Sequence, residues 1–142
     1  MNIKNTKWSP KSGVTILEIL IVLSIIALIA GVVGPRLIGY LGRAKTETAS
    51  LQIAQIRQTV QLFYIDVGRY PTDSEGLAVL LSAPAGEASW AGPYLESTDG
   101  IIDPWGRDYI YSEPETAADF SIKSLGRDGE EGGTGEDQDL GQ

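Results

Sequence analysis

The feature that most constrains this chain is an apolar run near its N-terminus. Residues 11–18 read KSGVTILE, and the run Val14–Gly34 holds no charged side chain except Glu18. A helix rises about 1.5 Å per residue, so this run is long enough to cross the roughly 30 Å hydrocarbon core of a bilayer. We therefore expect a membrane-inserted helix over residues 14–34.

Two other interpretations of the run fit less well. A removable secretory signal peptide would be shorter and would end in a small-residue cleavage site. A buried core helix would need more surrounding chain than the remainder offers. Basic residues flank the run on both sides: Lys4, Lys7 and Lys11 before it, and Arg36, Arg43 and Lys45 after it. This near balance does not decide the orientation, and we expect a cytoplasmic N-terminus because the C-terminal part is predicted to be a translocated domain.

Glu18 needs an explanation of its own. A charged side chain at the centre of a bilayer costs roughly 2.5–3.5 kcal/mol on insertion scales. The carboxylate either lies near the interface and reaches water, or it meets a cation. The run contains no Lys or Arg. A free α-amine at Val14 would serve, and it would exist only if the chain were cut after Gly13.

Composition excludes several classes of function. The chain has 142 residues, enough for one domain and an anchor, with a net charge of −8 and neither Cys nor His. Disulfides, thiolate nucleophiles and imidazole-based triads are thereby excluded, and zinc lacks its preferred ligands. No basic patch favours nucleic acid as a partner, and no preorganised nucleophile is visible, so we expect no enzyme.

The helix is predicted to continue beyond the membrane. Gly34-Pro35 marks the boundary, because proline removes one backbone hydrogen bond. Over residues 35–67 an apolar stripe recurs at spacings of three and four, formed by Ile53, Ile56, Val60, Phe63 and Val67. This stripe is expected to cover the core of the soluble domain, and Gly68 is a stop signal.

The remaining residues, 68–142, predict a small α+β domain. Glu75–Leu81 favours a short helix, and residues 82–100 favour a loop. Asp108–Ser112 and Phe120–Ser124 alternate in side-chain character and predict two strands joined by Glu113–Asp119. A small antiparallel sheet packed on the helix stripe accounts for these patterns.

The C-terminal loop, residues 124–140, alternates glycine with Asp and Glu. Such a segment suits calcium, which takes six to eight oxygen ligands at about 2.3–2.6 Å, but it also fits a solvated acidic tail. An EF-hand register beginning at Asp128 matches poorly, because Gly132 takes the fifth position and Asp139 the twelfth. The β-roll pattern G-G-x-G-x-D occurs once, and a roll needs several stacked copies.

The N-terminal residues resemble a known processing motif. Gly13-Val14-Thr15-Ile16-Leu17-Glu18, behind a basic leader, resembles the prepilin cleavage motif of type IV pilins and type II secretion pseudopilins. The resemblance implies that the leader, residues 1–13, is removed after Gly13 and that Val14 is then methylated. It also implies that Glu18 neutralises the amine of a neighbouring subunit during assembly. The family usually has Phe where this chain has Val14.

A second resemblance covers most of the remaining chain. The tracts that carry it are Gly68-Arg69-Tyr70-Pro71-Thr72, Glu75-Gly76-Leu77, Gly92-Pro93-Tyr94-Leu95, Asp103-Pro104-Trp105-Gly106 and Ser124-Leu125-Gly126. Their order and spacing resemble the major pseudopilins of type II secretion. This implies a structural subunit of a periplasmic filament, anchored in the bacterial inner membrane. The implied partners are copies of itself, minor pseudopilins, a prepilin peptidase/methyltransferase and an inner-membrane assembly platform.

The same resemblance implies one calcium ion in the C-terminal loop. Carried over by position, carboxylates would come from Asp128, Asp137 and Asp139, and main-chain oxygens from Leu125 and Glu130, with Thr134 or its neighbour as a further candidate. Two alternatives stay open at this point. One is a type IV pilus or minor pilin subunit, and the other is a membrane-anchored calcium-binding module that never polymerises.

Overall fold

The computed structural model describes residues 13–115 and 120–141. The chain divides into two compact units, the first ending at Ile38 and the second beginning at Gly39. Most of the predicted leader, residues 1–12, lies outside the described residues, as does part of the predicted connection Glu113–Asp119.

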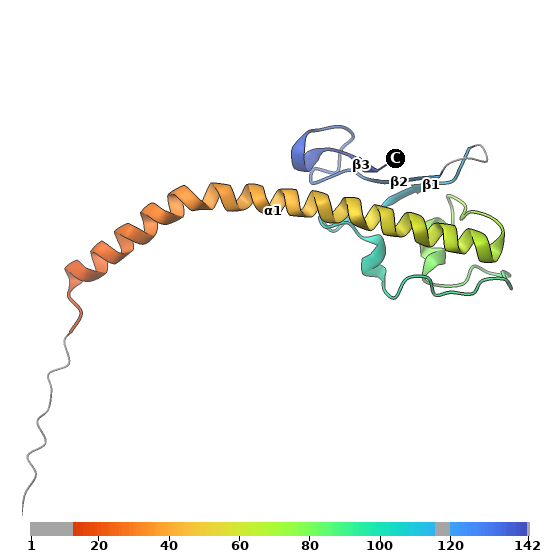
Figure 1. The fold of residues 1–142 in the computed structure, drawn as a ribbon, viewed down its shortest axis with the longest axis horizontal. Coiled ribbons are helices and arrows are strands. Elements are labelled where there is room, and N and C mark those ends of the chain that lie inside the picture. The colour runs from red at the N-terminus through yellow and green to blue at the C-terminus, as the bar shows by residue number, and fades with distance from the viewer. Residues whose placement is uncertain (1–12, 116–119, 142) are drawn as a thin grey trace, which may run out of the picture. The chain divides into compact units, whose positions relative to one another are not determined.

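The predicted long helix is confirmed as α1, Ile16–Val67 (Figure 1). Thr15 caps its first turn, because its side-chain Oγ1 accepts a hydrogen bond from the Glu18 N–H at 3.2 Å. Pro35 lies inside the helix. The helix ends where Gly68 takes a φ of +82°, a backbone conformation that glycine adopts readily.

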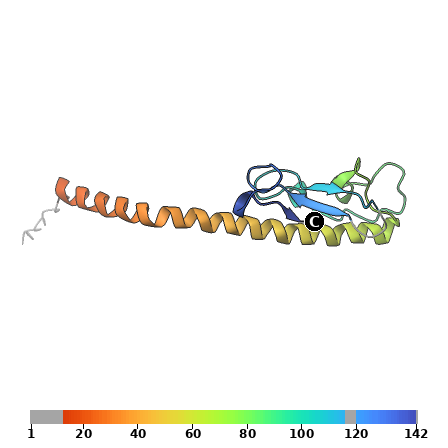
Figure 2. The same ribbon diagram turned by 90° about the horizontal axis from the view of Figure 1, so that it is seen from above.

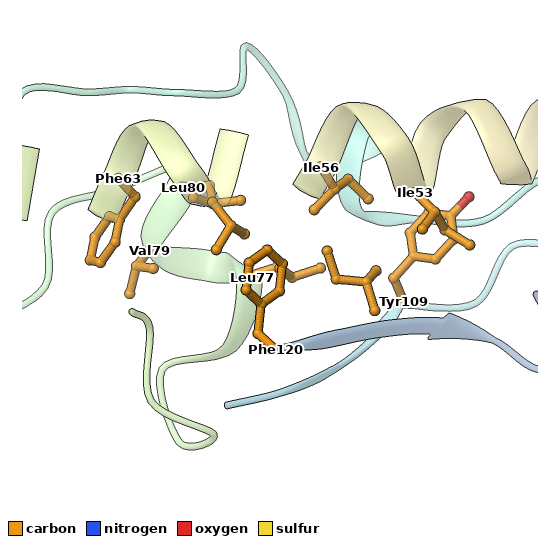
Figure 3. Packing of buried hydrophobic residues seen from close by; sticks show 10 residues of the cluster. Ile53, Ile56, Phe63, Leu77, Val79, Leu80, Tyr109 and Phe120 are labelled. Atoms are coloured by element: carbon orange, nitrogen blue, oxygen red, sulfur yellow. The ribbon is translucent and has the colours of Figure 1, made fainter. Parts of the chain in front are cut away.

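In the second unit, the apolar stripe of α1 forms one side of the core. Ile53, Ile56, Val60 and Phe63 are buried, and Val67 is partly buried against them, as the spacing predicts. Figure 3 shows side chains from three sources meeting here: the helix, the segment Leu77–Leu80 and the sheet region with Tyr109 and Phe120. Burying each large side chain of this kind contributes about 1.5–3 kcal/mol, so this contact is what holds the sheet to the helix.

The sheet is antiparallel and has the order β1-β2-β3. Strand β1 is Ile110–Ser112 and β2 is Ser121–Ser124, so the two predicted strands are present but shorter. Ile110 pairs with Lys123, and Ser112 pairs with Ser121. Figures 1 and 2 show the strands alongside the second half of α1.

Strand β3, Leu140–Gly141, was not predicted from the sequence. Two residues are too few to show an alternating pattern, and glycine has low strand propensity. Ser124 pairs with Leu140 and Lys123 with Gly141, which returns the chain to the sheet after the acidic loop.

The segment between helix and sheet contains two 3-10 turns, η1 Gly76–Leu80 and η2 Thr98–Ile101. The predicted short helix Glu75–Leu81 is therefore present as η1, a tighter helix. Trp90 donates its indole N–H to the Val79 carbonyl at 2.8 Å, which closes the following loop over the core.

Candidate functional site

The first candidate site is the N-terminal end of α1. Gly13 and Val14 precede the helix and are exposed, and Thr15 supplies the cap described above. Glu18 lies in the first turn, where its negative charge is favoured by the helix dipole. Thr15 and Glu18 match the T-x-x-E pattern of a helix start, a signal that sequence reasoning about the membrane overlooked.

The apolar half of α1 carries an exposed hydrophobic surface. Its most apolar 18-residue window has a mean hydropathy of 3.0 and is not buried at all, so α1 is long and apolar enough to cross a membrane. Ser24 donates its hydroxyl to the Leu20 carbonyl at 2.7 Å, which satisfies its polar group within the helix.

The second candidate site is the acidic loop between β2 and β3, and a buried network anchors its start. The Asp103 carboxylate accepts the Ser124 hydroxyl at 2.7 Å and the backbone N–H groups of Trp105 and Arg107 at 3.0 and 2.9 Å. Gly126, with a φ of +65°, leaves no room for a Cβ, since one would lie 2.7 Å from the Glu136 carbonyl oxygen. The sequence shows Asp103 only as the first residue of a tract that carries the family resemblance, because its partner Ser124 is distant along the chain.

The three expected carboxylate ligands lie in different local environments. Both oxygens of Asp137 accept hydrogen bonds from Arg127, each at 2.8 Å. Asp128 accepts the Glu130 N–H at 3.1 Å. Asp139 accepts the Gly132 N–H at 3.0 Å through Oδ2.

One buried side-chain oxygen in the described part of this loop has no hydrogen-bond partner. Asp139 Oδ1 is buried and accepts no hydrogen bond from the described residues. A bound cation would satisfy such an atom. Of the expected main-chain ligands, the Leu125 carbonyl accepts, among the described residues, one long hydrogen bond of 3.3 Å from the Gly129 N–H.

The loop does not otherwise form a ready metal centre. Within residues 13–115 and 120–141, no three acidic side chains converge closely enough to hold an ion. The unpartnered Asp139 oxygen is a suitable ligand for a cation, whereas both oxygens of Asp137 already accept hydrogen bonds from the Arg127 guanidinium.

Comparison with known proteins identifies the family. The family model described as "Type II secretion system (T2SS), protein G" matches residues 36–142, and the prokaryotic N-terminal methylation motif matches residues 8–34. The chain belongs to the type II secretion system protein G family. The core protein G of Xanthomonas campestris pv. campestris is 33% identical over 130 residues, covering 92% of this chain and 88% of that relative. The core protein G of Pseudomonas aeruginosa is 34% identical over 136 residues, covering 92% and 94%.

A solved structure agrees with this protein G assignment. The major pseudopilin from the type 2 secretion system of enterohaemorrhagic Escherichia coli has a TM-score of 0.58 and 30% sequence identity. The match covers 76% of this chain and 94% of that one. The predicted family and fold, a long helix with a small antiparallel sheet, are thereby confirmed.

Membership in the protein G family has two further consequences. It is a family of structural subunits, which agrees with the prediction that the chain is not an enzyme. Together with the apolar half of α1, it also indicates a membrane-anchored protein that takes part in self-assembly.

Proposed function

We propose that this chain is the structural subunit of a periplasmic pseudopilus that drives type II protein secretion across the outer membrane. The observation that carries the proposal is the uncovered apolar half of α1 in a protein G family member. Before assembly a bilayer would cover this surface, and in the filament the same segment of neighbouring copies would do so.

The proposal includes a location and a set of partners. The chain would cross the bacterial inner membrane once, with its C-terminal domain in the periplasm. A prepilin peptidase/methyltransferase would process it, and an inner-membrane assembly platform would add it to the filament. Minor pseudopilins would join the same polymer.

Processing would leave the start of the helix intact. Cleavage between Gly13 and Val14 would retain Thr15 and its bond to the Glu18 N–H. The new amine would be the methylated N-terminus of Val14, one residue before the capping residue Thr15. Glu18 of one copy would pair with the Val14 amine of the next, which removes an uncompensated charge from the apolar interface.

Substitution of Glu18 tests this assignment. Glu18→Gln should still be cleaved and should remain in the membrane, but filaments seen by electron microscopy after overexpression should be lost. Ser24→Ala is the matched control, because it removes a polar group already satisfied within the same helix. Mass spectrometry of the extracted protein should find a methylated Val14 at its start. Normal filaments from Glu18→Gln would reject the pairing, and a retained leader would reject the processing.

We also propose that the acidic loop binds one calcium ion. Asp128, Asp137 and Asp139 would supply carboxylates, and Leu125 and Glu130 main-chain oxygens. The unpartnered Asp139 oxygen and the high proportion of acidic residues in the loop sequence support this proposal. Calcium supplies positive charge and demands oxygen ligands, so it would fasten the loop between β2 and β3.

Thermal unfolding with calcium or with a chelator tests the calcium loop. Binding to the folded form alone adds about 2.7 kcal/mol at a ligand concentration one hundred times Kd. Calcium should therefore raise the unfolding temperature, and Asp139→Asn should abolish that rise. Glu131→Gln, which removes the same charge from an exposed position, should retain it. An unfolding temperature that is the same in calcium and chelator would reject the site.

A further inference from the structure

The loop contains a cation of its own. The guanidinium of Arg127 donates from Nε to Asp137 Oδ1 and from Nη2 to Asp137 Oδ2, both at 2.8 Å. This parallel arrangement uses the planar fork of arginine, which a lysine ammonium cannot reproduce. Asp137 is thus paired at both oxygens before any metal is considered.

The backbone supports the same contact. The Arg127 N–H donates to the Glu136 carbonyl at 2.8 Å, so both main chain and side chain of Arg127 hold the segment that precedes β3. Gly133, with a φ of +81°, packs against the backbone of Asp137, where an added Cβ would lie 2.7 Å from the Asp137 carbonyl carbon. Asp137 is therefore contacted at its side chain by Arg127 and at its backbone by Gly133.

The carboxylates of Asp128 and Asp139 have different hydrogen-bond partners from that of Asp137. Asp139 keeps one oxygen unpartnered among the described residues, and Asp128 accepts only a local backbone bond. The pKa of Arg127 is raised, chiefly by its hydrogen bonds to Asp137. The ion pair is partly exposed, with 56% of the Arg127 side chain and 29% of the Asp137 side chain accessible.

We propose that Arg127 is the internal counter-ion of Asp137, which keeps the acidic loop folded without calcium and competes with calcium for that carboxylate. The competition rests on the calcium loop of the proposed function, whereas the metal-free role rests on the geometry alone. Calcium takes carboxylate oxygens directly, and a calcium ion on Asp137 would lie close to the positive guanidinium that already binds the same carboxylate, so the two cations repel each other there. Arg127 therefore raises the calcium concentration at which the loop is half-saturated.

The test measures calcium affinity by titration calorimetry on the full-length chain in mild detergent. Arg127→Gln should bind calcium roughly tenfold more tightly than the unmodified chain, a change equal to about 1.4 kcal/mol in binding free energy. Arg127→Lys keeps the charge but loses the fork, and it should tighten binding in the same direction. Lys123→Gln removes one positive charge from an exposed position on β2 and should change the affinity little, because exposed charges are screened.

Thermal unfolding in chelator provides a second measurement. Arg127→Gln should unfold at a lower temperature than the unmodified chain without calcium and at a similar temperature with saturating calcium. Unchanged affinity together with an unchanged unfolding temperature in chelator would overturn the proposal.

The two proposals fail in different ways. If the unmodified chain binds no calcium but Arg127→Gln does, the competition is supported. If neither binds calcium, the calcium loop of the proposed function and the competition are both wrong. In that case the metal-free role of Arg127 is tested separately. Arg127→Gln must then unfold in chelator at a lower temperature than the unmodified chain, or the metal-free role is also wrong.

Discussion

The hydroxyl of Tyr109, next to the sheet, donates to Gln52 Oε1 on helix α1 at 2.8 Å. Tyr109 is buried, and burial raises the pKa of its phenol, so the group donates its proton throughout the physiological range. This hydrogen bond joins helix α1 to the sheet region of the second unit, in addition to the apolar contact between them. A sheet of three short strands depends on such anchors, because it is too small to be stable by itself.

Tyr109→Phe should lower the free energy of unfolding by about 1–2 kcal/mol, because it leaves the Gln52 oxygen without its donor in a partly buried position. Urea unfolding followed by tryptophan fluorescence measures the change. Tyr64→Phe is the control: that side chain is 43% exposed, and its loss should stay within about 0.5 kcal/mol. Equal effects of the two substitutions would contradict an anchoring role for Tyr109.

Gly141→Ala should detach β3 from the sheet. Gly141 has a φ of +93°, and an added Cβ would overlap the Ile122 carbonyl oxygen on β2. Backbone strain and the lost strand pairing together should cost about 2–3 kcal/mol. Gly106→Ala is the matched control, since its φ is +89° but a Cβ there meets nothing within 4 Å. It should cost about 1 kcal/mol, and an equal loss would mean that contact with β2 contributes nothing.

Glu75 should make the free energy of unfolding depend on pH in the acid range. The guanidinium of Arg69 donates to both Glu75 oxygens at 2.7 and 2.9 Å. These bonds and the Thr72 N–H lower the pKa of Glu75 from 4.5 to about 2. A lowered folded-state pKa adds stability that is complete above pH 4.5 and is lost as the pH falls towards 2.

Glu75→Gln should therefore reduce the free energy of unfolding at pH 7 by about 1 kcal/mol, the discounted value for a partly exposed ion pair. The difference from the unmodified chain should shrink towards zero as the pH approaches 2. Glu87→Gln is the comparison, because Glu87 lies 3.5 Å from Arg69 Nε and should contribute less. A difference that stays constant across the acid range would show that Glu75 acts without its charge.

Ile65→Glu should weaken self-assembly without unfolding the subunit. Leu51, Leu62 and Ile65 share the face of α1 opposite the core stripe and are 67%, 54% and 73% exposed. A second copy of the chain is the expected occupant, since the family self-assembles and the apolar half of the same helix is also uncovered.

Cross-linking of filaments in cells should fall at least severalfold for Ile65→Glu, while the unfolding temperature of the subunit changes little. Gln61→Glu introduces the same charge at an exposed, already polar position and should assemble normally. Assembly that is equally good in both variants would place this face outside the interface.

Local patterns determined much of this protein from its sequence. The apolar run at 14–34 and the stripe from Ile53 to Val67 predict one long helix and the face it buries, because helical periodicity depends only on near neighbours. Alternation predicts β1 and β2 for the same reason. The motif around Gly13 and Glu18 requires no tertiary contact to be read, and the match to the N-terminal methylation motif agrees with it.

Tertiary structure decided the features that join distant residues. Gln52 and Tyr109 are 57 positions apart, and Asp103 and Ser124 are 21 apart, so no local pattern reports their contacts. Strand β3 exists only because the acidic loop returns Leu140 to Ser124. The sequence shows Arg127 and Asp137 as two charges among many, whereas the fold selects them as a pair. The physical reason is that a hydrogen bond depends on the positions of two groups in space, and the fold alone sets those positions.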